Sequence, residues 1–113
     1  MLNDLQRYKL ANLLRNSYES DPWSLERIAS HLGFQLTQRE KEALRREINT
    51  ICSRYSDLEC VANIGKGYFL PRSPLEFQKI IYFYESRLHG VLERRKQFEK
   101  VIQNLKQNEP ATV

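Results

Sequence analysis

The order of apolar and polar positions along the chain predicts four helices and one β-hairpin. Apolar residues recur at helical spacing in residues 3–17, 23–33 and 37–54, and again without a stop signal in residues 73–107. Residues 58–70 instead predict two strands, 58–64 and 68–70, around a glycine-containing turn. The predicted fold class is mainly α with a small β-hairpin, followed by a long C-terminal helix.

Capping signals indicate where these helices begin and end. Thr37 with Glu40, and Ser73 with Glu76, have the spacing of a capping box, so the third and last helices are expected to begin there. Gly33 would end the second helix in the left-handed conformation.

Apolar stripes predict which faces of the first and third helices are buried. The first helix carries the stripe Leu5, Tyr8, Leu10, Leu13 and Leu14. The third carries Leu44, Ile48, Ile51 and Tyr55 on one side. At about 100° per residue, its opposite side presents Arg39, Glu42, Arg46, Asn49 and Ser53.

Composition is that of an ordinary globular protein with a mild basic excess. The 113 residues carry a net charge of +4, and the surplus lies in residues 37–54 and 73–113. No stretch approaches the ~20 apolar residues that cross a bilayer, and the first residues lack a signal-peptide core. The sequence therefore predicts an intracellular, cytoplasmic protein that does not associate with membranes and keeps its two cysteines reduced.

Signals for catalysis are weak. The two cysteines and two histidines show no metal-ligand spacing, and no nucleophile motif stands out. The segment Gly65-Lys66-Gly67 is too short to be a phosphate-binding loop. We therefore expect no enzymatic activity, no metal and no cofactor.

The order of the predicted elements is that of a winged helix-turn-helix domain. Beyond this order, residues 24–72, with "LTQREKEALRREI" and "IGKGYFLP", resemble small winged-helix proteins of bacterial phages and prophages. Residues at the matching motif positions are Thr37, Arg39, Glu40, Gly65, Lys66, Gly67 and Tyr68; Gln38 and Lys41 depart from the usual pattern. The resemblance implies a winged helix-turn-helix domain in residues 1–72 and sequence-specific binding of double-stranded DNA as a small transcriptional regulator.

Particular side chains are expected to contact DNA. On the third helix, bases would be read by Gln38, Arg39, Glu42, Arg46 and Asn49, next to the capping residue Thr37. Arg45 and Lys66 would contact phosphates, and the glycines beside Lys66 would let the main chain come close to the DNA. A charged helix face with internal ion pairs and a solvated hairpin tip is the simpler interpretation of the same residues.

A protein–protein adaptor or inhibitor that does not bind DNA is the alternative function. A DNA-binding surface should be continuously positive from Arg39 through Arg46 to Lys66, whereas an adaptor should interrupt it with exposed carboxylates or apolar side chains.

The spacing of apolar residues in the last predicted helix, residues 73–107, indicates a homodimer. Two sets of residues recur every seven positions and are offset by four, as in a coiled coil over about four heptads. The first set is Phe77, Tyr84, Val91, Phe98 and Leu105; the second is Ile81, Leu88, Arg95 and Ile102. We expect residues 73–107 to form this dimerisation helix, in either orientation, and residues 108–113 to form a disordered tail.

Overall fold

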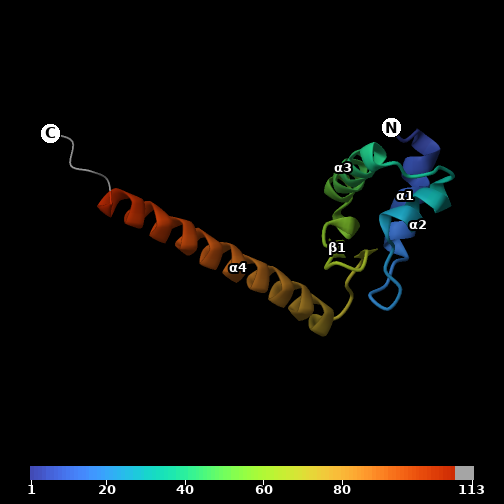
Figure 1. Cartoon of the computed structure of the whole chain (residues 1–113). Helices are drawn as coiled ribbons and strands as arrows, with labels where there is room; N and C mark the ends of the chain where they lie inside the picture. The colour runs from blue at the N-terminus through green and yellow to red at the C-terminus, as the bar shows by residue number, and fades with distance from the viewer. Residues whose placement is uncertain (109–113) are drawn as a thin grey trace. The chain divides into compact units, whose positions relative to one another are not determined.

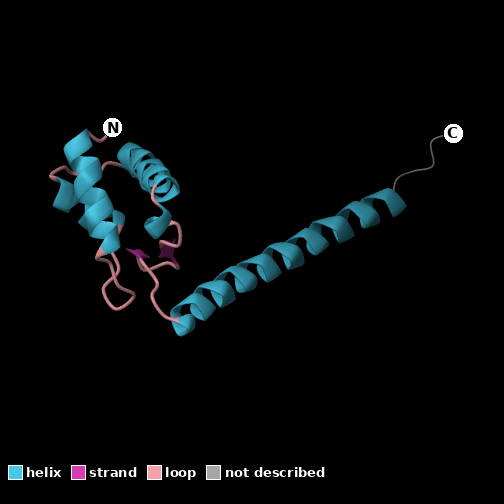
Figure 2. Cartoon of the chain, turned by 180° about the vertical axis from the view of Figure 1, so that it is seen from behind, coloured by secondary structure: helices cyan, strands magenta, loops and turns pink. Residues whose placement is uncertain are grey.

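The computed structural model describes residues 1–108, most of which are helical (Figure 1). The elements in chain order are α1 (Asp4–Arg15), α2 (Leu25–Leu32), α3 (Gln38–Arg54), the 3₁₀ turn η1 (Ser56–Leu58), β1 (Ala62–Asn63), β2 (Tyr68–Phe69) and α4 (Pro74–Gln107). The predicted class, mainly α with one small hairpin and a long last helix, is confirmed (Figure 2).

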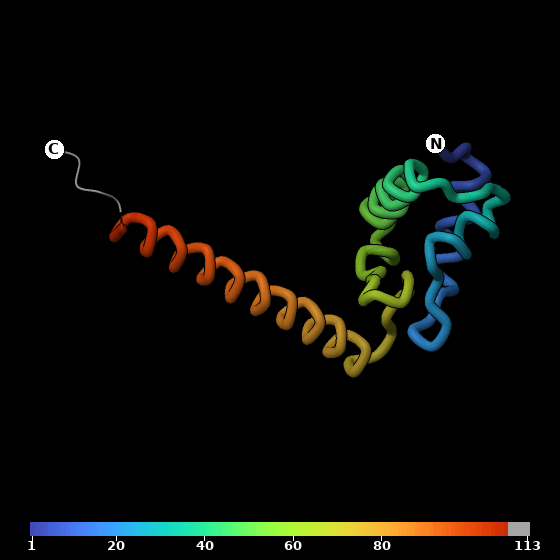
Figure 3. Tube along the Cα trace, in the orientation of Figure 1, coloured from blue at the N-terminus to red at the C-terminus, as the bar shows by residue number. Residues whose placement is uncertain are grey.

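Two compact units divide the chain, Met1–Phe77 and Gln78–Val113. The first contains α1, α2, α3 and the hairpin, and the second consists of α4 from its second turn onward (Figure 3). Residues 109–113 of the predicted tail lie outside the described part of the chain.

The predicted caps are confirmed, with one difference at the start of α4. The Thr37 hydroxyl accepts a hydrogen bond from the Glu40 N–H at 3.3 Å, and Gly33 ends α2 at φ 90°. The Ser73 hydroxyl accepts from the Glu76 N–H at 3.2 Å, but the Glu76 carboxylate accepts from the Arg72 N–H rather than from the capping residue. In the Ser73–Glu76 capping box, the hydrogen bond that returns to the carboxylate therefore comes from the residue before the cap.

The hydrophobic core lies between α1, α2, α3 and η1. Its fully buried large apolar residues are Leu10, Leu14, Ile28, Leu44, Ile48 and Leu58. The predicted apolar stripe of α1 is wrong at its start, because Leu5 and Tyr8 are 62% and 66% exposed. At about 100° per residue they project from the side of α1 opposite to Leu10 and Leu14, which places them in solvent.

The hairpin is shorter than predicted. Each strand has two residues, with Ala62 opposite Phe69 and Asn63 opposite Tyr68, and the start of the predicted first strand is instead the turn η1. Leu58 and Ala62 are buried while the residues between them are mostly exposed, a spacing of four rather than the alternation of a strand. The core burial of Leu58 therefore holds the chain in a turn where the sequence alone favoured β structure.

A third segment pairs with the hairpin. Trp23, just before α2, forms an antiparallel bridge with Tyr68, in which the Trp23 N–H donates to the Tyr68 carbonyl at 2.9 Å and the Tyr68 N–H donates to the Trp23 carbonyl at 2.8 Å. Gly67 has φ 128°, and a Cβ built on it would lie 2.7 Å from the Trp23 carbonyl carbon. Gly67 thus permits a close approach of the hairpin to the Trp23 main chain.

An ion pair joins α1 to α3 beside the core. The Arg7 Nε lies 3.2 Å from a carboxylate oxygen of Glu47, whose side chain is 15% exposed. Burial by itself would raise the pKa of Glu47, but the hydrogen bond and charge of Arg7, together with the Leu2 N–H, lower that pKa below its ordinary value. The charged form of Glu47 therefore stabilises the folded chain.

Replacing Glu47 by glutamine is expected to destabilise the fold in a pH-dependent way. A carboxyl whose pKa is lower in the folded than in the unfolded chain adds stability above its ordinary pKa, and this is lost as pH falls through the folded pKa. Glu47→Gln should lower the free energy of unfolding by about 1–2 kcal/mol at pH 7, and the difference from wild type should shrink on acidification below the ordinary value of 4.5. Urea unfolding from pH 7 to pH 3 measures this; Glu93→Gln, at an exposed site of α4, is the control. A pH-independent difference would contradict the assignment.

Alanine substitutions at three glycines should distinguish the effect of close packing on stability from the effect of a positive φ. Gly67→Ala is expected to destabilise by about 2–3 kcal/mol, because it combines a positive φ with the clash against Trp23. Gly65→Ala shares the positive φ (106°) but meets open space, and should destabilise by about 1 kcal/mol. Gly90→Ala, in open space on α4, should stabilise by up to ~1 kcal/mol. Denaturant unfolding of the three variants tests the order, and equal effects at Gly67 and Gly65 would refute the packing role.

Candidate nucleic-acid interface

Burial of one side of α3 determines which of its side chains face solvent. Leu44, Ile48 and Ile51 are at most 2% exposed and pack in the core. Tyr55, the predicted fourth member of this face, is instead the residue after the helix and is 45% exposed. The polar side of α3 is consequently held outward along the whole helix.

All the side chains predicted to contact DNA are exposed. They are Thr37, Gln38, Arg39, Glu42, Arg45, Arg46 and Asn49 at the start of or along α3, and Lys66 in the hairpin turn. The structure therefore places six of them on α3, Thr37 at its N-cap and Lys66 in the hairpin turn.

Each carboxylate of α3 has a partner. Glu40 accepts from the Thr37 N–H at 3.1 Å and closes the capping box. Glu47 pairs with Arg7, and Glu42 forms an ion pair with Arg45 one turn later. Two residues predicted for separate roles, Glu42 in base reading and Arg45 at phosphates, thus contact each other.

Three arginines of α3 remain without such partners. Within residues 1–108, the guanidinium groups of Arg39, Arg46 and Arg54 make no ion pair or hydrogen bond. At about 100° per residue the three project within a sector of about 80°. Because each carboxylate of α3 already has a partner, these three guanidinium groups are left without an ion pair in residues 1–108.

Arg54 was missed by the sequence analysis. The outer face predicted from the sequence ended at Ser53, and Arg54 is the last residue of α3. Eight residues separate Arg46 from Arg54, which at about 100° per residue puts both side chains on the same side of the helix. Arg54 also lines two hollows on either side of α3. One of these, of about 310 Å³, includes Arg7, Arg46 and Thr50.

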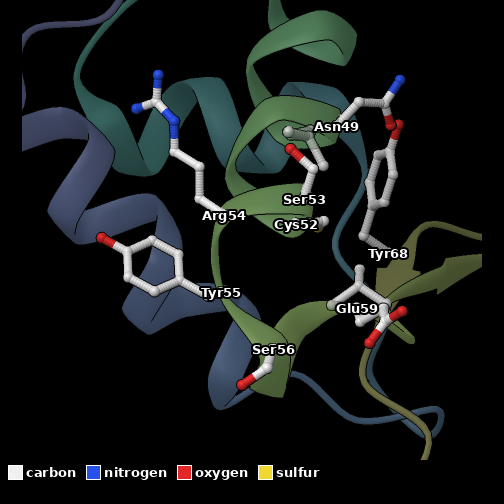
Figure 4. Close-up of a pocket in the computed structure, with 10 residues that line it drawn as sticks. Asn49, Cys52, Ser53, Arg54, Tyr55, Ser56, Glu59 and Tyr68 are labelled. Atoms are coloured by element: carbon white, nitrogen blue, oxygen red, sulfur yellow. The ribbon is translucent and has the colours of Figure 1, made fainter.

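The other hollow is a groove of about 650 Å³ between the second half of α3 and the hairpin (Figure 4). Its polar lining includes Asn49, Ser53, Arg54, Glu59 and Tyr68. Burial raises the pKa of the Tyr68 hydroxyl above its ordinary value, so Tyr68 stays a neutral hydrogen-bonding group at physiological pH. The groove therefore combines these polar groups with the apolar side chains of Ile48 and Val61.

The hairpin turn presents Lys66 on an ordered backbone. The Asn63 side-chain oxygen accepts hydrogen bonds from the N–H groups of Gly65 at 2.9 Å and Gly67 at 3.3 Å. Lys66 is exposed at the tip and has no ion-pair partner in residues 1–108. Of the two glycines beside Lys66, Gly67 is buried against the Trp23 main chain, whereas a Cβ built on Gly65 would meet open space.

Residues 1–108 contain no group of three His, Cys, Asp or Glu side chains placed to hold a metal ion. Across the same residues, no helix combines the length and apolarity needed to span a membrane.

The comparisons with known proteins give no match. No protein-family model fits the chain, and no curated protein or solved structure shows significant similarity to it.

Proposed function

We propose that the N-terminal unit is a winged helix-turn-helix that binds double-stranded DNA, and that the protein is a small transcriptional regulator. The observation that carries this proposal is the sector of unpaired arginines on α3, formed by Arg39, Arg46 and Arg54. A major groove admits an α-helix and offers acceptors on guanine that arginine recognises in a bidentate manner.

The arrangement around α3 suits this role. Three helices enclose one core, α3 begins after a short link from α2, and a hairpin follows α3. The bridge between Trp23 and Tyr68 adds a third extended segment to the hairpin, which makes it a small wing rather than an isolated ribbon. A wing beside a recognition helix can contact the sugar-phosphate backbone while the helix reads bases.

The groove between α3 and the hairpin suits a nucleic-acid backbone. Asn49, Ser53 and Tyr68 supply neutral hydrogen-bonding groups, and Arg54 supplies a positive charge at the same hollow. Glu59 adds one negative charge to this lining, so phosphates are expected to lie nearer to Arg54. We therefore add Arg54 to the predicted phosphate contacts, Arg45 and Lys66.

The pair between Glu42 and Arg45 refines the predicted base contacts. A carboxylate at Glu42 would accept a hydrogen bond from the cytosine amino group. Because Arg45 lies one turn further along α3 and pairs with Glu42, it holds that carboxylate on the helix surface and offsets its repulsion of phosphates. Gln38, Arg39, Arg46 and Asn49 complete the proposed reading surface.

Selection of bound fragments from a random duplex pool tests the proposed function. The full chain should enrich a defined sequence, and affinity for it should fall steeply as salt increases. If no salt-sensitive binding to any fragment is found, the adaptor function replaces this proposal.

Arg46→Ala should weaken binding to the selected site by about 1–3 kcal/mol and relax preference at one base position. Lys9→Ala removes the same charge from α1, at a hollow shared with Trp23 and His31, and is the matched control. Fluorescence anisotropy with the selected site and single-base variants measures both effects. If Arg46→Ala and Lys9→Ala lose the same binding affinity, Arg46 contributes only its positive charge and reads no base.

Lys66→Ala should weaken binding to all sequences alike. Loss of one phosphate contact is expected to reduce the slope of log affinity against log salt by about one. Titrations from 50 to 200 mM salt measure this slope, with Lys9→Ala again as control. An unchanged slope with an altered base preference would contradict the phosphate role of Lys66.

A further inference from the structure

An exposed seam of mostly apolar residues runs along α4. We define the seam as the first set, Phe77, Tyr84, Val91, Phe98 and Leu105, together with the second set, Ile81, Leu88, Arg95 and Ile102. No residue of α4 is buried, and the apolar seam residues from Ile81 to Leu105 are 50–65% exposed. An exposed stripe of apolar residues from Phe77 to Leu105, interrupted only at Arg95, is a site for a partner helix rather than an ordinary solvated surface.

We propose that a second copy of α4 covers the seam in antiparallel orientation, with Leu88 of one copy opposite Val91 of the other. In this register every seam residue except Leu105, which faces Pro74, lies opposite a residue of the other set. The facing pairs are Phe77 with Ile102, Ile81 with Phe98, Tyr84 with Arg95, and Leu88 with Val91, each occurring twice by symmetry. The seam is therefore complementary to itself, which identifies the occupant as another copy of this chain.

The sizes of the seam side chains favour the antiparallel arrangement. Phe77, Tyr84 and Phe98 all belong to the first set, whereas the apolar members of the second set are aliphatic. A parallel, in-register pair would place aromatic against aromatic in some layers and aliphatic against aliphatic in others. Antiparallel pairing puts an aromatic side chain against an aliphatic one in two of the four kinds of layer, and it avoids layers of two aromatic rings.

Arg95 favours the same orientation. Arg95 pairs with Glu99 of its own helix at 2.9 Å. In a parallel pair two Arg95 guanidinium groups would nevertheless meet within the seam, where like charges repel each other. In the antiparallel register each Arg95 instead faces Tyr84, whose ring can accept a guanidinium. The same helix already stacks arginines on aromatic rings, with Arg87 4.4 Å from the Phe83 centroid and Arg94 5.0 Å from that of Phe98.

The charged residues beside the seam favour a parallel pair of helices, but their contribution to the free energy of dimerisation is small. Parallel helices would bring Arg94 near Glu99 of the other copy, whereas antiparallel helices bring Arg87 near Arg94. These positions lie at the solvent edge, where an ion pair contributes about 0–1 kcal/mol. Antiparallel pairing also brings Ile80 against Val101, which adds apolar contact at the same edge. The surroundings of Arg95 and the sizes of the facing seam side chains, which are buried in the dimer, therefore decide the orientation.

Disulfide cross-linking distinguishes the orientations. Cys52→Ala and Cys60→Ser first remove the native cysteines. Two chains are then made, one with Ile81→Cys and one with Phe98→Cys, and one of the two bears a mass tag. Each chain is oxidised alone, and then both are oxidised as a mixture. Antiparallel pairing predicts tagged–untagged dimers in the mixture and little cross-linking of either chain alone. Cross-linking of each chain with itself would overturn the proposal in favour of a parallel pair. A dimer in which neither experiment gives cross-links would place the contact elsewhere and also overturn it.

Sedimentation at micromolar concentration tests whether the seam is the interface. The wild-type chain should be a dimer, and Phe98→Asp with Ile102→Asp should be monomeric. The matched control, Lys100→Asp with Gln103→Asp, changes two α4 residues outside the seam and should remain a dimer. Trp23 fluorescence monitors whether the N-terminal unit stays folded in all variants. A monomeric wild type, or a dimer unaffected by the seam substitutions, would refute the proposal.

The inference depends on α4 alone and not on the proposed DNA binding. Salt-sensitive binding by a chain that is monomeric or parallel would refute only the seam proposal. An antiparallel dimer without any DNA binding would refute only the proposed function.

Discussion

Burial of Leu44, Ile48 and Ile51 is the constraint on which the proposed interface depends. These side chains fix the rotation of α3 about its own axis against the core, and this in turn decides which polar residues meet solvent. The capping box at Thr37 fixes where the helix starts and therefore the phase of every later position. Packing of the apolar face and capping of the first turn thus determine what the outer face of α3 displays.

The distribution of charge follows from that orientation. Glu47 on the flank of α3 reaches Arg7, and Glu42 on the outer face pairs with Arg45. Within residues 1–108, Arg39, Arg46 and Arg54 therefore form no ion pair. A helix with three acidic and five basic residues can in this way present a surface that is more positive than its composition indicates. Net charge alone would not have separated this surface from an ordinary solvated helix face.

The helices could be predicted from sequence because their signals are local. Capping residues and apolar spacing act within one or two turns, and the observed bounds of α2, α3 and α4 agree with them. The hairpin could not be predicted to the same accuracy, since its length depends on Leu58 entering a core built by distant helices. The contact between Gly67 and Trp23 spans more than forty positions, and no short-range pattern indicated it. For the candidate site, exposure of the predicted residues followed from helical periodicity, but the pairing of Glu42 with Arg45 depended on side-chain conformation.

The fixed hairpin turn has a consequence for the thermodynamics of recognition. Ordering a flexible loop on binding costs about 1–2 kcal/mol for each residue whose backbone is immobilised. The Asn63 side chain and the pairing with Trp23 hold the main chain around Lys66 in the free protein, so little of that entropy remains to be lost. What Lys66 gives up on meeting an anionic partner is mainly the rotamer freedom of its own side chain. A contact from this turn should therefore show a small entropic penalty of ordering, with most of its free energy coming from charge neutralisation and the release of counterions.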